Sequence, residues 1–268
     1  MAARRRLDSE LVRRGLADSR VQAVRMIESG LVLVAGAPAD KPARLVSPAD
    51  PLVVIGDRPR FVGRGGEKLQ AALSGFGLDV TGATVLDAGS STGGFTDCLL
   101  QAGAARVVAV DVGRAQLHER LRADPRVEVR ERTDIRSFVA ADPFAIVVAD
   151  LSFISIRTVA GALVALAADG ADIVVLVKPQ FEAGRVEVSQ GRGIIRDPEI
   201  WARSLRGAIT AMEEAGAANM GVMVSPLRGS EGNVEFLAWF RRGAAEAGTV
   251  DAVDTAVADA VARFGGAA

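Results

Sequence analysis

The sequence predicts an α/β protein in which a small basic α+β module precedes a mostly parallel seven-stranded sheet with helices on both faces. Beyond residue 66, short apolar runs alternate with longer segments of helical periodicity, as they do when helices connect parallel strands. The first 68 residues carry 13 Lys and Arg against 8 Asp and Glu, whereas the remainder carries 19 against 25. A basic amino-terminal part joined to an acidic body favours an anionic partner, usually nucleic acid.

The composition is that of an ordinary globular protein, with 49% hydrophobic and 24% charged residues among 268. A single cysteine, Cys98, excludes a disulfide within the chain and a zinc site built from cysteines, and a single histidine, His118, excludes paired imidazole ligands. We therefore expect no metal. Only three of the 32 Lys and Arg residues are lysines, namely Lys41, Lys68 and Lys178. Because arginine stands almost everywhere else, these positions are candidates for chemistry that needs an amine.

Neither a membrane span nor an export signal is predicted. The longest apolar runs, such as residues 173–177, are strand-sized and far below the ~20 residues of a membrane helix. The basic amino terminus is followed neither by an apolar stretch nor by a small-residue cleavage site. We expect a cytoplasmic protein with no membrane partner, and a monomer.

Two helices are predicted in the basic part. Apolar residues recur at helical spacing from Leu7 to Val12 before Gly15, and Ser19 is suited to cap a second helix that ends at Gly30. Two β-rich runs follow, at residues 31–34 and 52–55. Arginines gather on the helix pair, which favours contact with phosphates.

The text RLDSELVRRGLADSRVQAVRMIESGLVLVAGAPADKPARLV, residues 6–46, resembles the small RNA-binding domain of ribosomal small-subunit protein four. That resemblance implies a helix pair whose basic face meets structured RNA. The sequence departs from the family at the β-turn, where Ala35 replaces the usual Asn or Asp before Gly36. With two arginines of the following linker, the expected RNA-binding residues are Arg4, Arg5, Arg6, Arg14, Ser19, Arg20, Arg25, Arg60 and Arg64.

The segment around IGDRPRFVGRGG is rich in Gly, Pro and Arg and is predicted to be a linker. We therefore expect an RNA-binding domain at residues 1–56, a linker at 57–66 and a second domain at 67–268. Strands are predicted at residues 84–87, 106–111, 127–130, 145–150, 173–178, 220–224 and 235–241. Helices are predicted at residues 94–101, 154–168 and 200–215, and the Ala-rich carboxyl-terminal stretch is compatible with another.

The most informative local motif is VLDAGSSTGGFTDCLL, residues 85–100. A strand ends at Asp87, a loop of Gly and Ser follows, and a helix begins near Gly93. Glycines allow close approach of the backbone to a ligand, and the amino end of a helix offers free N–H groups to a negative group. The spacing D-x-G-x-x-x-G-G matches neither the dinucleotide fingerprint nor the phosphate loop. Asp111 ends the next strand, where it could accept both ribose hydroxyls, so a ligand with a ribose but no pyrophosphate fits best.

This loop resembles the S-adenosylmethionine (AdoMet) loop of class I, Rossmann-like methyltransferases, and another nucleotide-binding fold is the alternative. The resemblance implies AdoMet as cofactor, with its carboxylate at the glycine loop and its adenine amino group at Asp134. The implied cofactor-binding residues are Asp87, Gly89, Ser91, Gly93, Gly94, Phe95, Asp111, Val112, Thr133, Asp134 and Ile135.

Four charged residues stand where chemistry is possible. Lys68 follows the linker, Asp150 and Lys178 end the fourth and fifth strands, and Glu235 begins the last one. Ligands of open α/β sheets bind outside the carboxyl ends of the strands, so Asp150 and Lys178 should flank one cleft. Taken singly, each residue could also be charged only because the chain returns to solvent there.

Together, these residues match position by position the Lys-Asp-Lys-Glu tetrad of RNA 2′-O-methyltransferases of the FtsJ type. The flanking texts RGGEKL, ADLSFIS, VKPQFEAG, GIIRDP and SPLRGSEGNVEFL resemble the TlyA family, which joins a ribosomal-protein-like domain to this methyltransferase domain. The resemblance covers nearly the whole chain. It implies AdoMet-dependent methylation of cytidine 2′-hydroxyls in 16S and/or 23S ribosomal RNA, with ribosomal RNA or ribosomal subunits as the partner.

A ribose 2′-hydroxyl is a poor nucleophile until its proton is removed or strongly polarised. Lysine can give up its own proton and act as a base, whereas arginine, with a pKa above ~12, cannot. We expect Lys178 to be the base, Asp150 and Glu235 to orient its amine, and Lys68 to assist electrostatically and position the ribose. Rival functions are a non-catalytic RNA-binding or ribosome-assembly protein, a base methyltransferase, and the membrane-lytic activity implied by the family's hemolysin label.

Overall fold

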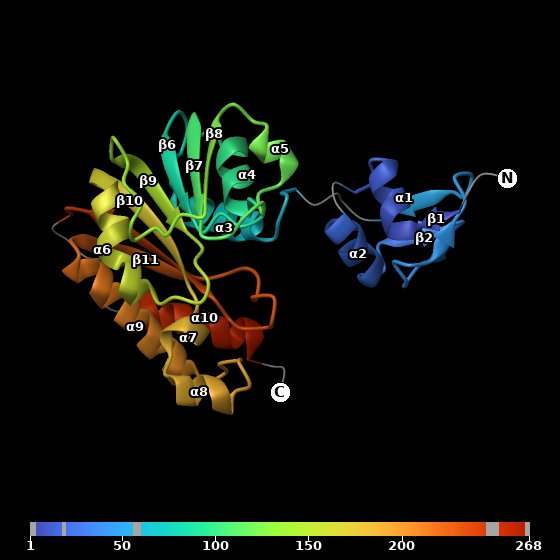
Figure 1. The fold of residues 1–268 in the computed structure, drawn as a ribbon. Coiled ribbons are helices and arrows are strands. Elements are labelled where there is room, and N and C mark those ends of the chain that lie inside the picture. Colours follow the sequence, from blue (N-terminus) through green and yellow to red (C-terminus); the bar gives the residue numbers. More distant parts are fainter. Residues whose placement is uncertain (1–3, 18–19, 56–59, 245–251, 266–268) are drawn as a thin grey trace. The chain divides into compact units, whose positions relative to one another are not determined.

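The computed structural model describes residues 4–17, 20–55, 60–244 and 252–265. The chain divides into two compact units, Met1–Pro59 and Arg60–Ala268 (Figure 1). Of the expected linker, residues 57–59 lie outside the described residues, and residues 60–66 belong to the second unit, where the helix α3 begins at Gly65.

The first unit packs two helices against short antiparallel strands. Its elements are β1 (Arg5–Arg6), α1 (Leu7–Arg13), α2 (Arg20–Glu28), β2 (Val32–Val34), β3 (Ala37–Pro38), β4 (Leu45–Val46) and β5 (Leu52–Val54). The strands form a β1–β4 pair and a β3–β2–β5 sheet. Leu11, Ile27 and Val32 are fully buried between helices and sheet, as the helical spacing of apolar residues predicts. At the β2–β3 turn, Ala35 and Gly36 both have positive φ, a conformation that usually selects Asn-Gly.

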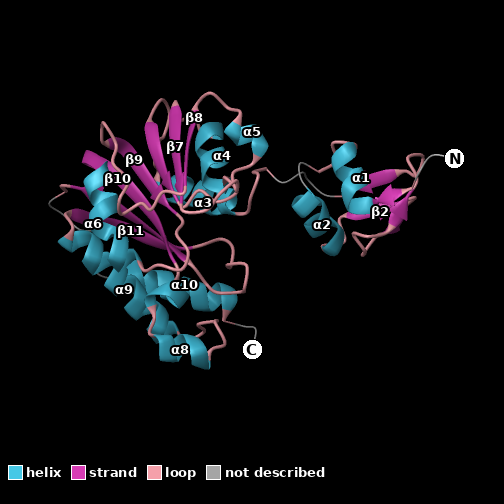
Figure 2. Cartoon of the chain, in the orientation of Figure 1, coloured by secondary structure: helices cyan, strands magenta, loops and turns pink. Residues whose placement is uncertain are grey.

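The second unit contains the predicted seven-stranded sheet, in the order β11-β12-β10-β9-β6-β7-β8 (Figure 2). Its strands are β6 (Thr84–Ala88), β7 (Arg106–Asp111), β8 (Val127–Glu131), β9 (Phe144–Ala149), β10 (Ala167–Val177), β11 (Ala217–Val224) and β12 (Phe236–Arg242). All neighbours are parallel except for β12, which runs antiparallel between β10 and β11. The α/β fold with a mostly parallel sheet is therefore confirmed.

Helices cover both faces of this sheet, as predicted. They are α3 (Gly65–Phe76), α4 (Gly94–Gln101), α5 (Glu119–Arg122), α6 (Ile156–Leu166), α7 (Pro179–Glu182), α8 (Arg185–Gln190), α9 (Pro198–Glu214) and α10 (Ala252–Phe264). One core lies under α6, α9 and α10, and the other under α3, α4 and α5. Strand β10 shows why both form: Ile173 and Val175 face the first core, whereas Val174 and Leu176 face the second.

The boundary that differs most from the prediction is the start of β10. The predicted helix 154–168 is α6, which ends at Leu166, and β10 begins directly at Ala167 instead of Ile173. The register against β9 shifts between Ala167 and Asp172, so the strand starts through an irregularity. The intervening AADGAD text lacks β-branched residues, which is why local propensity does not reveal the early start.

Candidate active site

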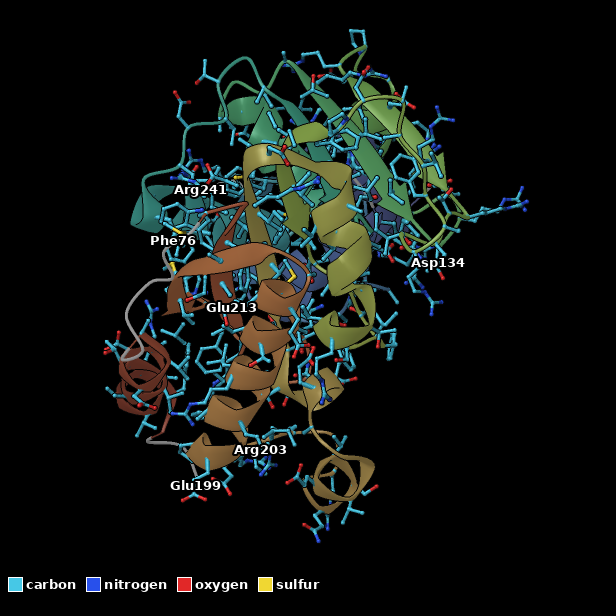
Figure 3. All side chains as sticks on the ribbon, turned by 90° about the vertical axis from the view of Figure 1, so that its left-hand side faces the viewer. Phe76, Asp134, Glu199, Arg203, Glu213 and Arg241 are labelled. Carbon is cyan, nitrogen blue, oxygen red and sulfur yellow. The ribbon has the colours of Figure 1, made fainter. Side chains whose placement is uncertain are left out.

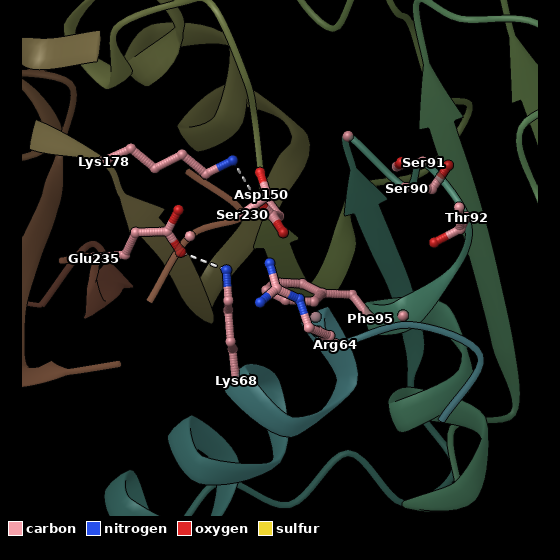
Figure 4. Close-up of a pocket in the computed structure, with 14 residues that line it drawn as sticks. Arg64, Lys68, Ser90, Ser91, Thr92, Phe95, Asp150, Lys178, Ser230 and Glu235 are labelled. Atoms are coloured by element: carbon pink, nitrogen blue, oxygen red, sulfur yellow. Dashed lines mark hydrogen bonds and ion pairs between the residues drawn. The ribbon is translucent and has the colours of Figure 1, made fainter. Parts of the chain in front are cut away.

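A cavity of about 230 Å³ lies within the second unit, at the carboxyl ends of β6, β9 and β10 (Figure 4). All four predicted catalytic residues line it: Lys68, Asp150, Lys178 and Glu235. Of the predicted cofactor-binding residues, Gly89, Ser91, Gly94 and Phe95 line it. Arg64, which we expected to contact RNA, also lines it. The sheet thus brings together residues that are up to 171 positions apart, between Arg64 and Glu235.

The four charged residues form two separate pairs. Lys178 Nζ lies 2.7 Å from Asp150 Oδ1, and it donates a hydrogen bond to Ser152 Oγ at 2.9 Å. The contact with Asp150 is an ion pair without hydrogen-bond geometry. Lys68 Nζ donates to Glu235 Oε2 in a short, buried ion pair. The expectation that Glu235 orients the Lys178 amine was therefore wrong: Glu235 holds Lys68 instead (Figure 4).

The direction of each strand explains why these residues meet. Asp150 directly follows β9, and Lys178 directly follows β10. Because β12 is antiparallel to β10, with Phe236 opposite Val177, its amino end lies at the carboxyl ends of the parallel strands and carries Glu235 there. Lys68 comes from the first turn of α3, on the face that Leu69 and Ala72 also bury.

The glycine loop approaches the cavity closely. Gly89 has φ +84°, and a Cβ there would lie 2.4 Å from the Asp150 carbonyl oxygen, so a side chain is excluded. Gly93, with φ +98°, precedes α4, and a Cβ would lie 2.2 Å from Leu121. Gly93, at the N-cap position of α4, has no side chain that could cap the helix. Free N–H groups beside Arg64 suit the carboxylate of an amino-acid ligand, so these residues fit the methionine end of AdoMet.

The predicted ribose and adenine residues lie outside this cavity. Asp111 accepts the backbone N–H groups of Ser91 at 2.8 Å and Gly113 at 2.6 Å, so its carboxylate adjoins the glycine loop. Val112 is exposed, Ile135 is buried, and Thr133 donates to the Glu131 carbonyl.

Asp134 is not the free acceptor that we expected for the adenine amino group. It lies at the surface of the unit (Figure 3), and its carboxylate pairs with Arg136 at 2.5 Å. The hydrogen bonds from Arg136 lower the pKa of Asp134 to about 2. Adenine recognition by this side chain would require the Arg136 pair to open.

Asp87 lies beneath the loop and does not line the cavity. Thr96 Oγ1 donates to Asp87 Oδ2 at 2.6 Å, whereas Oδ1 has no hydrogen-bond partner among the described residues. Complete burial raises the pKa of Asp87 to about 7, against the opposing effect of the Thr96 hydrogen bond. Its contact with Thr96 fixes the first turn of α4, so Asp87 supports the loop from below.

In the first unit, two fully buried carboxylates hold several of the arginines predicted to bind RNA. Asp8 pairs with Arg6 at 2.8 Å and with Arg20 at 3.1 Å. Glu10 pairs with Arg14, whose guanidinium also donates to the carbonyls of Ser47, Pro48 and Asp50. Arg14 therefore ties α1 to the β4–β5 loop. The remaining expected residues are placed as follows: Arg4 and Arg5 are exposed, Arg60 lies over the Phe61 ring at 5.0 Å, Ser19 lies outside the described residues, and the side chain of Arg25 is not described.

Sequence reasoning missed two residues in the loop that follows Asp150. Ser152 accepts the Lys178 hydrogen bond, and Phe153 is 92% exposed with φ +64°, its ring centre 5.2 Å from that of Phe181. Both stand in the ADLSF text after Asp150. That text is one of those by which the sequence resembles the TlyA family, but its side-chain directions are not encoded in any local pattern.

Metal-binding clusters and membrane-spanning helices are both absent from the described ranges. No three or more His, Cys, Asp or Glu side chains gather there in an arrangement that could hold a metal ion. Within the same ranges, every helix is too short or too polar to cross a membrane.

Comparisons with known proteins agree with this architecture. The FtsJ-like methyltransferase family model matches residues 61–242, and the S4 domain model matches residues 5–52. The chain is 50% identical to the 16S/23S rRNA (cytidine-2′-O)-methyltransferase TlyA of Mycobacterium tuberculosis, over 97% of this chain and 99% of that protein. It is 39% identical to Hemolysin A of Brachyspira hyodysenteriae, over 88% and 99% of the two chains.

A solved structure from Streptococcus thermophilus, named as a hemolysin, is also similar. Its TM-score is 0.78 at 36% identity, over 99% of this chain and 98% of that one. The matches extend across both units and include the elements that carry the cavity. The chain belongs to the TlyA family, in which an S4 domain precedes an FtsJ-like methyltransferase domain.

Proposed function

We propose that this methyltransferase transfers the methyl group of AdoMet to a ribose 2′-hydroxyl of ribosomal RNA. The observation that carries the proposal is one cavity that joins the amino end of α4, where Gly94 and Phe95 line it, to the Lys178–Asp150 pair. The first part suits the cofactor, and the second suits removal of a hydroxyl proton. A base methyltransferase would not need a lysine at this point.

When bound, AdoMet supplies a methyl group made electrophilic by its positively charged sulfur. The backbone of Gly89 and the first N–H groups of α4 would hold its carboxylate, with Arg64 beside them. Asp111 retains acceptor capacity for ribose hydroxyls, because each carboxylate oxygen can accept more than the one backbone N–H that it receives. The remaining predicted cofactor residues stay proposals.

Lys178, in its neutral amine form, is the proposed base that takes the 2′-hydroxyl proton. Asp150 stabilises the ammonium that forms, since the two groups already lie 2.7 Å apart. Lys68 is held by Glu235 and lines the same cavity, where its charge can position the ribose and its neighbouring phosphate. Fixed groups of this kind reduce the entropy that the reaction must lose on reaching its transition state.

The target ribose has to leave its helix to reach this cavity. Phe153 lies in the loop that follows Asp150, and its aromatic ring is exposed. The ring of Phe181 lies against it. Stacking of an unpaired base on such a ring typically contributes about 1–3 kcal/mol. We infer that Phe153 receives the base of the flipped nucleotide.

The finer assignments follow the name of the Mycobacterium tuberculosis relative, which acts on cytidine in 16S and 23S rRNA. We propose the same nucleotide and one or both of these RNAs here, in assembled subunits and therefore in the cytoplasm. Residues 1–56 would contact the RNA through Arg4, Arg5, Arg6 and Arg20, and Arg60 of the second unit stays a proposed RNA contact. A monomeric, metal-free enzyme stays a prediction.

The direct test combines methyl-labelled AdoMet with isolated small and large bacterial subunits, followed by mapping of alkali-resistant 2′-O-methyl sites. We expect label at cytidine, and we expect Lys178→Arg to reduce the rate by about 10²–10⁴-fold, because arginine keeps the charge but cannot accept the proton. AdoMet binding by the variant should be unchanged.

Two results would contradict the proposal in different ways. If neither the subunits nor free ribosomal RNA acquires label while AdoMet still binds, the protein is a non-catalytic RNA-binding protein. If Lys178→Arg methylates at a near-normal rate, the reaction stands but Lys178 is not its base.

A further inference from the structure

The Lys178 amine has a second oxygen partner besides the carboxylate of the tetrad. Its Nζ lies 2.7 Å from Asp150 Oδ1 and 2.9 Å from Ser152 Oγ, and it lies 5.8 Å from the centre of the Phe181 ring. The Lys178 side chain is about 10% exposed, so water can replace few of these contacts. Ser152 does not belong to the Lys-Asp-Lys-Glu tetrad, and it does not line the cavity.

Two contacts determine the orientation of a tetrahedral nitrogen, whereas one does not. With only the ion pair to Asp150, the amine could rotate about its Cε–Nζ bond, because that contact lacks the directionality of a hydrogen bond. The hydrogen bond to Ser152 Oγ stops this rotation. When the amine is neutral, the bond to Ser152 fixes one N–H and thereby restricts the directions of the second N–H and of the lone pair.

The residues that follow Ser152 restrict its position. Phe153 has φ +64°, a left-handed conformation that is strained for a residue other than glycine. The ring contact between Phe153 and Phe181 packs the loop after β9 against the start of α7. Ser152 and Lys178 thus belong to two segments that also contact each other through Phe153 and Phe181, which follow them shortly in the sequence.

We propose that Ser152 is a positioning residue of the methyltransferase. Its hydroxyl accepts a hydrogen bond from the Lys178 amine and, together with Asp150, directs the remaining position on Nζ toward the substrate hydroxyl. This inference rests on the proposed role of Lys178 as the base. It assigns Ser152 no contact with the cofactor or with RNA.

The test compares Ser152→Ala, Ser152→Thr and Ser74→Ala in the intact protein. Ser74 is a matched control, because it is an exposed serine that also accepts a side-chain N–H, from Gln70 at 3.1 Å. With methyl-labelled AdoMet and whichever ribosomal particle the unchanged protein labels, Ser152→Ala should lower kcat roughly three- to tenfold, the usual effect of one lost hydrogen bond. KM for the particle should not change. Ser152→Thr keeps the hydroxyl and should restore most of kcat, and Ser74→Ala should have no effect.

A second readout does not depend on methyl transfer. The chain has only three lysines, so labelling of lysine Nζ with ¹⁵N yields at most three ammonium signals, and Lys178→Arg identifies one of them. A held ammonium exchanges its protons slowly, so the Lys178 signal should weaken or vanish in Ser152→Ala and persist in Ser152→Thr and Ser74→Ala. A merely structural role of Ser152 would not produce this pattern.

The outcomes separate this inference from the proposed function. An unchanged Lys178 signal and an unchanged kcat in Ser152→Ala would overturn the positioning role, and so would a rise in KM at constant kcat, which would indicate direct substrate contact. A Lys178 signal that depends on Ser152, in a protein that methylates no ribosomal particle, would support the positioning and contradict the proposed function alone.

Discussion

Asp87 is a carboxyl group whose protonation state is set almost entirely by burial. Its pKa is raised to about 7, well above the ordinary value of 3.8, so the folded protein favours the neutral form. The stability that this preference contributes is fully present below about pH 4 and is lost as the pH rises through about 7. The carboxylate beneath the cofactor loop therefore works against folding under alkaline conditions.

The prediction is that Asp87→Asn, which imitates the neutral acid and can still accept from Thr96, becomes more stable relative to the unchanged protein as the pH rises. The gain between pH 5 and pH 8 should be on the order of 3 kcal/mol. Urea unfolding of both proteins at the two pH values measures it, with the exposed Asp79→Asn as control. A difference that does not depend on pH would contradict the burial argument.

For the four charged residues of the cavity, the sequence predicted that they come together but not which of them form ion pairs with each other. Lys68, Asp150, Lys178 and Glu235 stand at strand ends or just beyond the linker, and strand direction brings them to one cavity. The division into Lys68–Glu235 and Lys178–Asp150 depends on where helix α3 packs against the sheet. No motif records such a distance.

Among the elements, strands buried on both faces were the most predictable. Their continuous apolar runs, as in residues 107–110 of β7, are typical of parallel sheets, and β7 has the predicted bounds. Short helices such as α7 and α8 were not predicted, because four to six residues cannot show helical periodicity. They form where tertiary contacts satisfy their ends.

Glu182, at the end of α7, provides one of these contacts. Its buried carboxylate accepts hydrogen bonds from the Ile156 N–H at 2.7 Å and from the Ser155 hydroxyl, and thereby caps the amino end of α6. The Arg157 guanidinium also donates to the Glu182 carbonyl at 2.8 Å. The loops that follow Asp150 and Lys178 are thus joined by a second set of contacts.

We therefore predict that Glu182→Ala lowers the free energy of unfolding by about 1–3 kcal/mol, because it leaves the buried Ile156 N–H without an acceptor. Glu182→Gln keeps one acceptor oxygen and should lose less than half of that amount. Glu213→Ala, at an exposed position of α9 (Figure 3), should change stability by no more than about 0.5 kcal/mol. Equal losses of unfolding free energy in the Ala and Gln variants would show that the hydrogen bonds accepted by Glu182 at the amino end of α6 do not contribute to stability.

For the whole molecule, the charge division along the chain has a structural meaning that composition alone could not supply. Part of the positive charge of the first unit serves its own fold, because buried Asp8 and Glu10 bind Arg6, Arg13, Arg14 and Arg20. The bonds from these arginines hold the pKa of Asp8 far below its usual range and that of Glu10 near 2, against the effect of burial. Net charge therefore overstates the number of arginines that are free for RNA.

The distinction between Arg14 and Arg20 can be measured. The Arg20 side chain is 60% exposed and meets Asp8 through Nε, so its terminal nitrogens can reach a phosphate, whereas Arg14 is 20% exposed and meets four acceptor groups.

Arg20→Ala should weaken binding to the methylated ribosomal particle and reduce the slope of log affinity against log salt by about 0.7–0.9, the value for one lost phosphate contact. It should leave the stability nearly unchanged.

Arg14→Ala should instead lower the unfolding free energy of the first unit and affect RNA binding only through that loss. The control is Arg203→Ala on α9, whose side chain is 62% exposed and pairs with Glu187. Binding titrations at several salt concentrations, together with urea unfolding, separate the two roles. An Arg20→Ala variant with an unchanged salt slope would mean that buried Asp8 retains this arginine in the complex, so that RNA contact falls to arginines outside the pair.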